Sequence, residues 1–387
     1  MIVVAIVFWL CAALIAYTHL GYPAVLFVLT SMGSRRRRPR RTREQSTRAE
    51  FGSMPAVPLV SLIVAAYDEE EVIGAKIAEA LALDYPRERL QVIVASDGSG
   101  DATVERARAA GADLVLDLPR AGKVSAQNAA AERASGELLA FSDANSAWSP
   151  DALRRLVEPF ADPAVGYVCG QVRFLDPEGD NLEGSYWRFE MRVRAMESSL
   201  AGVTAGNGAI YAVRRSSYLP LPPSGSHDLS LPFLLSKRDQ MALYEPAARA
   251  TEKMVPTLEG EFARKRRMMV GIWDIVVGEG MLRPRGYRPL YAFEIASHRL
   301  LRYLSPLLHV VALIANLLLL GEGWVYVVTL VVQLAVLAAA LLARRLPLLP
   351  LRLARYYVMT TASIGAGLWD RLRHGAPGAW EKAEGTR

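Results

Sequence analysis

Two aspartates, each at the carboxyl end of a predicted buried strand, are the most informative residues of this sequence. Asp97 follows the apolar run Leu90–Ala95, and Asp143 follows the run Gly136–Ala140, about one βα repeat further along. In open α/β sheets, ligands bind at the edge formed by the carboxyl ends of the strands. An acid at the first position suits a nucleotide base or ribose, and an acid at the second suits a metal-bound diphosphate.

Strands and helices alternate from Pro58 to about Asp162, which predicts a doubly wound, mostly parallel α/β sheet. The predicted strands are Leu59–Ala65, Leu90–Ala95, Asp113–Leu116 and Leu138–Ser142, and the predicted helices are Glu69–Ala82, Ala102–Ala110 and Gly122–Ala134. Beyond them, the sequence predicts strands over Gly166–Phe174 and Ala209–Val213 and an amphipathic helix over Tyr186–Leu200.

The segment Met1–Thr30 is long and apolar enough to cross a membrane. It has no Asp, Glu, Lys or Arg between Ile2 and Leu29, and about 20 apolar residues span a bilayer. A secretory signal peptide is the alternative, but the segment lacks a positively charged start and its apolar run is too long. We therefore expect a retained transmembrane anchor.

A block of arginines directly follows this segment: Arg35–Arg38, Arg40, Arg41, Arg43 and Arg48. Because such residues mark the cytoplasmic side of a span, we expect the N-terminus outside and the rest of the chain inside. The block also suits anionic membrane lipids. We expect no nucleic-acid binding despite a pI of about 9.3, because the arginines lie beside a span and lack interleaved aromatics. The two cysteines, Cys11 and Cys169, provide no disulfide framework, which fits a reducing cytoplasm.

Apolar segments return near the C-terminus. Ser305–Leu320, joined by Leu300–Leu304, and Trp324–Leu342 are predicted spans. In Leu349–Leu368, two arginines leave only a short apolar run, which is short for a membrane span. A re-entrant or an interfacial segment is compatible with it, and the sequence does not fix its topology. We divide the chain into a transmembrane helix (1–33), a basic linker (34–57), an α/β domain (58–280), an interfacial segment (281–299), C-terminal membrane helices (300–370) and a tail (371–387).

Three motifs together resemble the family 2 inverting glycosyltransferases of the GT-A fold. They are Val60–Glu69, Asp97–Asp101 and Asp143–Asn145; each is weak alone, and their order and spacing carry the resemblance. It covers about residues 58–280 and extends more loosely into the C-terminal segments, as in bacterial membrane-bound polysaccharide synthases. The resemblance implies a GT-A domain that transfers a sugar from a UDP-sugar with inversion.

The resemblance assigns the first two motifs to the nucleotide. Ala65 and Tyr67 would let a flat uracil approach the backbone and stack or hydrogen-bond, and Glu69 belongs to the same stretch. Asp97 would accept a hydrogen bond from the uracil N3–H, a plain turn being the structural alternative. Lys123 starts a helix and suits a donor phosphate, because a helix N-terminus and an ammonium both attract anions; the alternative is a solvated surface lysine.

Asp143 matches the first acid of the family's DxD motif, which holds Mg²⁺ or Mn²⁺ against the donor diphosphate. Asn145 occupies the position of the second acid, so the chain departs from the motif here. An amide oxygen still ligates a hard cation but brings no charge. We therefore expect weaker metal affinity in the absence of nucleotide.

Asp228 resembles the catalytic base, which takes the proton of the acceptor hydroxyl as that oxygen attacks the anomeric carbon and UDP leaves. The family has another acid directly before it, where this chain has His227. We expect His227 to fill a surface position; tuning of the base is the alternative. Gly206, Asn207 and Gly208 resemble the acceptor loop, where glycine admits a sugar close to the backbone; a plain turn is the alternative.

Arg267 falls where processive synthases carry the arginine of a QxxRW motif. Arg264 stands at the glutamine and Met268 at the tryptophan, so only the arginine is retained. Arg267 suits stabilisation of the leaving diphosphate. Loss of the tryptophan removes a stacking platform for the acceptor sugar and argues against long-chain processivity. A basic helix on anionic headgroups is the alternative.

The sequence thus favours a glycosyltransferase integral to a bacterial inner (plasma) membrane, with its catalytic domain in the cytoplasm. Its expected partners are a UDP-sugar donor, a lipid-linked or polysaccharide acceptor and membrane lipids. One alternative is a processive synthase that also extrudes its product. The other is a non-catalytic scaffold, which Asn145 and His227 favour and Asp143 and Asp228 oppose.

Overall fold

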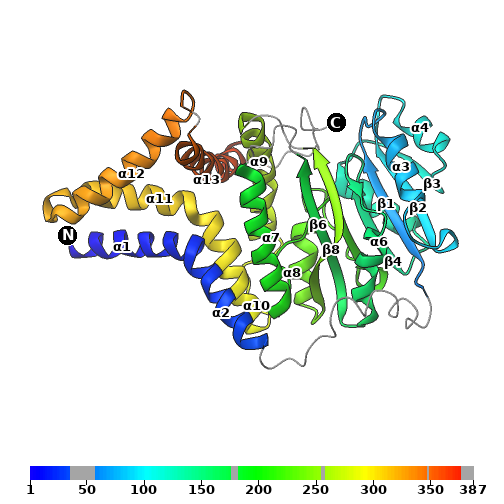
Figure 1. Cartoon of the computed structure of the whole chain (residues 1–387), viewed down its shortest axis with the longest axis horizontal. Coiled ribbons are helices and arrows are strands. Elements are labelled where there is room, and N and C mark those ends of the chain that lie inside the picture. The colour runs from blue at the N-terminus through cyan, green and yellow to red at the C-terminus, as the bar shows by residue number, and fades with distance from the viewer. Residues whose placement is uncertain (35–56, 176–181, 254–257, 347, 376–387) are drawn as a thin grey trace.

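The computed structural model describes residues 1–34, 57–175, 182–253, 258–346 and 348–375. An α/β domain occupies one end of the molecule, and long apolar helices project from its side (Figure 1). The arginine block and almost all of the expected linker lie outside the described residues, as does most of the expected tail.

Within the described residues, eight strands form one sheet in the order β3-β2-β1-β4-β7-β6-β8-β5. They are β1 (Val60–Ala66), β2 (Leu90–Asp97), β3 (Leu114–Leu118), β4 (Leu138–Asp143), β5 (Ala147–Trp148), β6 (Val165–Leu175), β7 (Ile210–Arg214) and β8 (Met241–Lys253). The pairs β1–β2, β1–β4, β2–β3 and β6–β8 are parallel, whereas β7 is antiparallel to β4 and β6, and β5 to β8. The predicted mostly parallel sheet is confirmed.

Helices cover both faces of the parallel part of the sheet. They are α3 (Ile73–Leu81), α4 (Thr103–Ala109), α5 (Lys123–Arg133) and α6 (Ala152–Val157). Along β1, Val64 packs with α3 and α4, whereas its neighbour Ile63 packs with α5, because successive side chains of a strand point to opposite faces. Every residue of β1 is buried, which explains its continuous apolar sequence.

The sequence pattern does not predict β5 or β8. The pairing of β8 with β6 jumps from Glu245 to Arg249, which leaves Pro246 outside the regular ladder. Proline cannot donate a ladder hydrogen bond, so its presence argues against a strand unless such an irregularity accommodates it. This bulge explains why the segment did not look like a strand.

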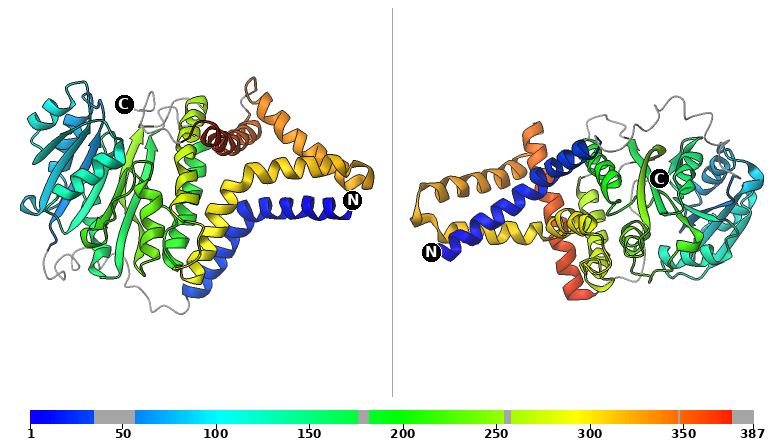
Figure 2. Two further views of the ribbon diagram at one scale, coloured as in Figure 1. Left: turned by 180° about the vertical axis from the view of Figure 1, so that it is seen from behind. Right: turned by 90° about the horizontal axis from the view of Figure 1, so that it is seen from below.

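The remaining helices of the domain are α7 (Leu182–Leu200), α8 (His227–Ser236) and α9 (Leu258–Trp273). At the N-terminus, α1 (Ile2–Ala16), a π-helical turn (Tyr17–Gly21) and α2 (Tyr22–Ser34) form one bent rod. Its α1 part lies beside α11 (Leu301–Leu318), where Phe8 and Cys11 pack against Ala312 and Ala315 (Figures 1 and 2). π-Helical turns are a recognised cause of such bends.

Three helices of the described residues are long and apolar enough to cross a membrane: Ile2–Met32, Pro289–Leu318 and Trp324–Leu342 (α12). The second contains α10 (Pro289–Glu294) and a π-helical turn (Ile295–Leu300) before α11, so it starts earlier than residue 300. Helix α13 (Leu349–His374) is not among them. It packs against α9 and runs across the three apolar helices (Figure 2). The three apolar helices indicate membrane association.

Candidate active site

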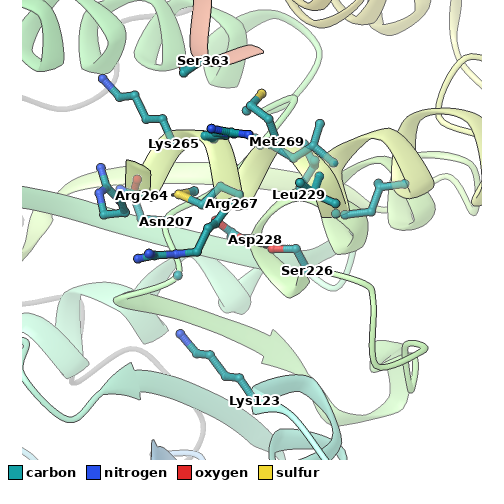
Figure 3. A pocket seen from close by; sticks show the side chains of 18 of the residues that line it. Lys123, Asn207, Ser226, Asp228, Leu229, Arg264, Lys265, Arg267, Met269 and Ser363 are labelled. Carbon is teal, nitrogen blue, oxygen red and sulfur yellow. Dashed lines mark hydrogen bonds between the residues drawn. The ribbon is translucent and has the colours of Figure 1, made fainter. Parts of the chain in front are cut away.

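A cavity of about 1190 Å³ begins at the carboxyl end of β4 and extends past α8 and α9 to α11 and α13. Eight of the twelve expected site residues line it: Lys123, Asp143, Asn145, Gly206, Asn207, Gly208, Asp228 and Arg267. Figure 3 shows Lys123, Asn207, Asp228 and Arg267 around this space. The other four, Ala65, Tyr67, Glu69 and Asp97, belong to β1, β2 and the loop after β1 and do not line the cavity.

Asp97 positions the loop that leads into α5. Its side chain is buried, and its carboxylate accepts hydrogen bonds from the backbone N–H groups of Ala121 at 2.7 Å and Gly122 at 2.9 Å. Gly122 has φ +97°, a conformation that favours glycine. The acid at the end of β2 therefore fixes the start of α5 and with it Lys123. Asp97 thus has a structural role beyond that of a turn residue.

Lys123 lies between two carboxylates and is only 22% exposed. Its ammonium is ion-paired with Asp143. Burial by itself would lower the pKa of Lys123, but Asp143, its hydrogen-bond partner, and Asp228 raise the pKa above its ordinary value. Lys123 is thus a charged residue of the cavity, not a solvated surface lysine.

Asp143 ends β4, and Asn145 follows in the next turn. Among the residues that the structure describes, no group of three or more His, Cys, Asp or Glu could hold a metal. One carboxylate and one amide oxygen fit a divalent cation that takes the rest of its ligands from substrate phosphates and water, as Mg²⁺ usually does. The residues present suit such a shared site.

Asp228 lies in the first turn of α8, with its carboxylate beside the expected acceptor loop. The Ser226 hydroxyl donates a hydrogen bond to it, and the Gly206 N–H donates to the Asp228 carbonyl at 2.6 Å. A Cβ added at Gly208 would lie 3.8 Å from the Asp228 carboxylate and 3.9 Å from Lys123 Nζ. Gly208 therefore leaves open the space between the expected base and the expected phosphate ligand.

The expected acceptor loop is held from behind by the sheet and by α7. A Cβ at Gly206 would approach the Tyr167 hydroxyl to 1.8 Å. The Asn207 side chain is buried; its nitrogen donates to the Gly170 carbonyl, and its oxygen accepts from Arg194. Both polar ends of Asn207 are thus engaged within the protein, and Gly208, not the buried Gly206, borders the open space.

His227 is buried, so the expected surface position was wrong. Its side chain packs among aromatic rings, with Nδ1 2.8 Å from the Tyr211 hydroxyl and Nε2 3.3 Å from the Tyr218 hydroxyl. Burial and the nearby Lys123 ammonium lower the pKa of His227 to about 3. A neutral imidazole therefore anchors the start of α8 directly before Asp228.

The loops after β1 and β2 form one hydrogen-bonded unit. The Glu69 side chain is buried, and its N–H donates to Thr103 Oγ1 at 2.7 Å. Arg120, which the sequence analysis did not single out, lies with its guanidinium carbon 3.3 Å from the Tyr67 ring centroid. Arginine commonly stacks on tyrosine. The Tyr67 face expected to receive a base is thus covered by Arg120, and nothing in the sequence pattern marked this contact.

Arg267 extends from α9 into the cavity (Figure 3). Its neighbours are engaged elsewhere: Arg264 pairs with Glu261 at 2.6 Å, and Arg266 with Asp370 of α13 at 2.5 Å. No ion pair within the described ranges involves Arg267, which is exposed. Its charge therefore faces the cavity and does not stabilise the fold through an ion pair of the described residues.

Most of the α/β domain matches a known family of proteins. Residues 61–219 match the profile of Glycosyl transferase family 2. An N-acetylglucosaminyltransferase of Rhizobium meliloti is 27% identical over 269 residues, covering 63% of this chain and 62% of that protein. The poly-beta-1,6-N-acetyl-D-glucosamine synthase of Staphylococcus aureus is 23% identical over 232 residues, covering 56% and 55%. The chain spans about half the length of the curated relatives it matches.

A solved structure shares the whole architecture. The mannosyltransferase PcManGT from Pyrobaculum calidifontis, determined in complex with GDP-Man and Mn²⁺, has a TM-score of 0.70 and 23% sequence identity. The match covers 95% of this chain and 99% of that one. It therefore shows a common fold that includes both the GT-A-like sheet and the apolar helices.

Proposed function

We propose that the chain, whose residues 61–219 match Glycosyl transferase family 2, transfers a sugar from a UDP-sugar to a lipid-linked or polysaccharide acceptor at the cytoplasmic face of a membrane. One observation carries the proposal. Three charged side chains surround one open space in the cavity. They are Lys123 for the diphosphate, Asp143 for the metal and Asp228 for the base.

Each residue has a role in this reaction. Asp143 and Asn145 would hold Mg²⁺ or Mn²⁺, which when bound neutralises charge on the donor diphosphate. Lys123 binds the same diphosphate. Asp228 accepts the proton of the acceptor hydroxyl as its oxygen attacks the anomeric carbon, and Arg267 stabilises the charge on the departing nucleoside diphosphate. Asp97 acts from behind by fixing the loop before Lys123.

Two nucleotides, UDP and GDP, are candidates for the donor. The resemblance to polysaccharide synthases supports a UDP-sugar, whereas PcManGT was solved with GDP-Man. The Tyr67 face, where the base is expected, carries Arg120. A base that stacks there must either displace the guanidinium or stack on it. Because both nucleotides remain candidates, the donor panel has to include UDP- and GDP-sugars.

A processive synthase is the second candidate function. It is favoured by the similarity to the poly-beta-1,6-N-acetyl-D-glucosamine synthase of Staphylococcus aureus. It is opposed by Met268, which stands where such enzymes carry a tryptophan and is 48% exposed. Product length measured against time separates the two: single additions support the first candidate, and early long products support the second.

The deciding experiment uses the purified full chain in detergent with Mn²⁺. Nucleoside diphosphate release and donor binding are measured for UDP- and GDP-sugars with the wild type, Asp228→Asn and the exposed control Asp239→Asn. Loss of a general base typically lowers the rate about 100-fold or more, so we expect release to collapse in Asp228→Asn, donor binding to persist, and the control to match the wild type. Absence of any nucleotide-sugar binding would favour the scaffold instead.

A further inference from the structure

The cavity continues well beyond the residues that the proposed reaction uses. We call the part lined by α7, α9, the Ile295–Leu300 turn, α11 and α13 the helical half, and the part lined by β4, α5, α8 and the end of β8 the sheet half. Figure 3 shows the two ends, with Lys123 in the sheet half and Lys265 and Ser363 in the helical half. Asp228 lies between them.

Basic side chains outnumber acidic ones in the helical half. Apart from Arg267, which the proposed reaction uses, its basic lining residues are Arg194, Arg264, Lys265, Arg266, Arg299 and Arg302, and its acidic ones are Glu190, Glu261 and Asp370. In the sheet half, by contrast, the charged lining residues are Lys123, Lys253, Asp143, Asp228 and Glu252. The helical half is therefore an electropositive compartment beside a slightly acidic one.

The neighbouring acids do not cancel this excess. Glu190 Oε1 lies 2.7 Å from Arg302, and Glu261 holds Arg264 and Lys265. Behind the wall, Glu197 is matched to His298, with Oε1 2.7 Å from Nδ1. Arg299 is only 8% exposed, and its Nε donates to the Thr204 hydroxyl at 2.9 Å. Buried positive charge in excess is costly until an anion compensates it.

The helical half also adjoins the apolar helices. Arg299, Arg302 and Tyr303 belong to the candidate span Pro289–Leu318. On α11, Tyr303 is followed at spacings of four, three and four by Leu307, Val310 and Ile314, which are 58%, 54% and 53% exposed. Residues at these spacings share one helix face. An apolar stripe thus leads away from the electropositive compartment along a membrane-crossing helix.

We propose that the helical half binds the phosphate or diphosphate group of a membrane-anchored acceptor lipid, whose tail lies along the apolar stripe of α11. Guanidinium groups suit phosphate oxygens because they form paired, charge-assisted hydrogen bonds. The inference rests on the proposed function, since it places the sugar hydroxyl of such a lipid next to Asp228. There the hydroxyl oxygen bonds to the anomeric carbon, the bond to the diphosphate breaks, and Asp228 takes the proton.

Binding of farnesyl diphosphate to the full chain in detergent with EDTA tests the inference without any turnover. Titration calorimetry compares it with farnesol and inorganic diphosphate, for the wild type, Arg302→Gln, Lys265→Gln and Arg302→Lys. A lost hydrogen bond to a charged group corresponds to about tenfold or more in affinity. We expect that loss in both glutamine variants, near-normal binding in Arg302→Lys, and much weaker binding of either comparison ligand.

Two further variants separate this inference from the proposed function. Arg288→Gln removes an exposed cation outside the cavity and should bind farnesyl diphosphate normally. Lys123→Gln should lose donor affinity and keep lipid binding. Wild-type-like binding by Arg302→Gln and Lys265→Gln, or equal binding of farnesol, would overturn the inference, while donor binding and release still report on catalysis. Equal binding of inorganic diphosphate would assign the site to a soluble phosphate instead. Nucleotide binding verifies that the variants at Arg302, Lys265 and Arg288 are folded, and retained lipid binding verifies it for Lys123→Gln.

Discussion

At the scale of single residues, each acid near the sheet edge already has a counterpart within the chain. Asp97 is matched by two backbone N–H groups, Asp143 by Lys123, and Asp228 by the Ser226 hydroxyl. A metal at Asp143 must therefore share a carboxylate with an ammonium. This competition makes the neutral Asn145 more consequential, because it brings no second charge to hold the cation.

Asn145→Asp should restore that charge. With a second carboxylate beside Asp143, we expect Mn²⁺ to bind about tenfold more tightly in the absence of nucleotide, since ligand charge tunes affinity for such cations. Calorimetric titration of the metal alone measures the change. Asn145→Ala, which removes the amide oxygen, should bind no better than the wild type; if alanine and aspartate behave alike, position 145 is not a ligand.

The burial of His227 predicts a pH dependence of stability. Its pKa is about 3 in the folded chain and about 6.5 when exposed, so the unfolded chain binds the extra proton as the pH falls. Stability is therefore lost below about pH 6.5, by about 2 kcal/mol between pH 7 and pH 5. Chemical denaturation at the two pH values should show this loss in the wild type and a smaller one in His227→Gln. Equal losses would place the responsible group elsewhere.

At the scale of elements, the alternation of apolar strands and helices predicted the parallel half of the sheet because buried parallel strands carry continuous apolar runs. The same pattern placed Asp97 and Asp143 at the ends of two strands on one edge of the sheet. What the sequence could not supply depends on contacts between distant segments. Nothing local to His227 signals that Tyr211 and Tyr218 enclose it, and nothing near Arg120 signals that it covers Tyr67.

The acceptor loop offers a test at this scale. Gly206→Ala forces a methyl group against the Tyr167 ring, and such overpacking typically costs about 1–3 kcal/mol. Because the Gly206 N–H holds the Asp228 carbonyl, we expect the sugar-transfer rate to fall with stability. Gly74→Ala, in the helix α3 with open space around it, is the matched control and should be neutral or stabilising in thermal denaturation. A Gly206→Ala chain as stable and active as the wild type would contradict the close packing.

At the scale of the whole molecule, the apolar helices form one bundle that points away from the α/β domain. The N-terminus and the turn between α11 and α12 lie together at the end farthest from the sheet (Figures 1 and 2). The cavity lies at the other end, against the start of the span Pro289–Leu318. If these helices cross a membrane, a lipid-linked acceptor can reach the cavity from the same face as a soluble nucleotide-sugar.

This arrangement predicts opposite accessibility for two introduced cysteines. Gly321→Cys lies exposed in the turn before α12, and Glu105→Cys lies exposed on α4 of the α/β domain. A membrane-impermeant maleimide applied to intact cells should label Gly321→Cys and should label Glu105→Cys only after lysis. The native Cys11 and Cys169 are buried and should react little in either case. Labelling of Glu105→Cys alone in intact cells would reverse the orientation. Labelling of both positions in intact cells would contradict a membrane between them, although the connecting helices are long enough to span the bilayer.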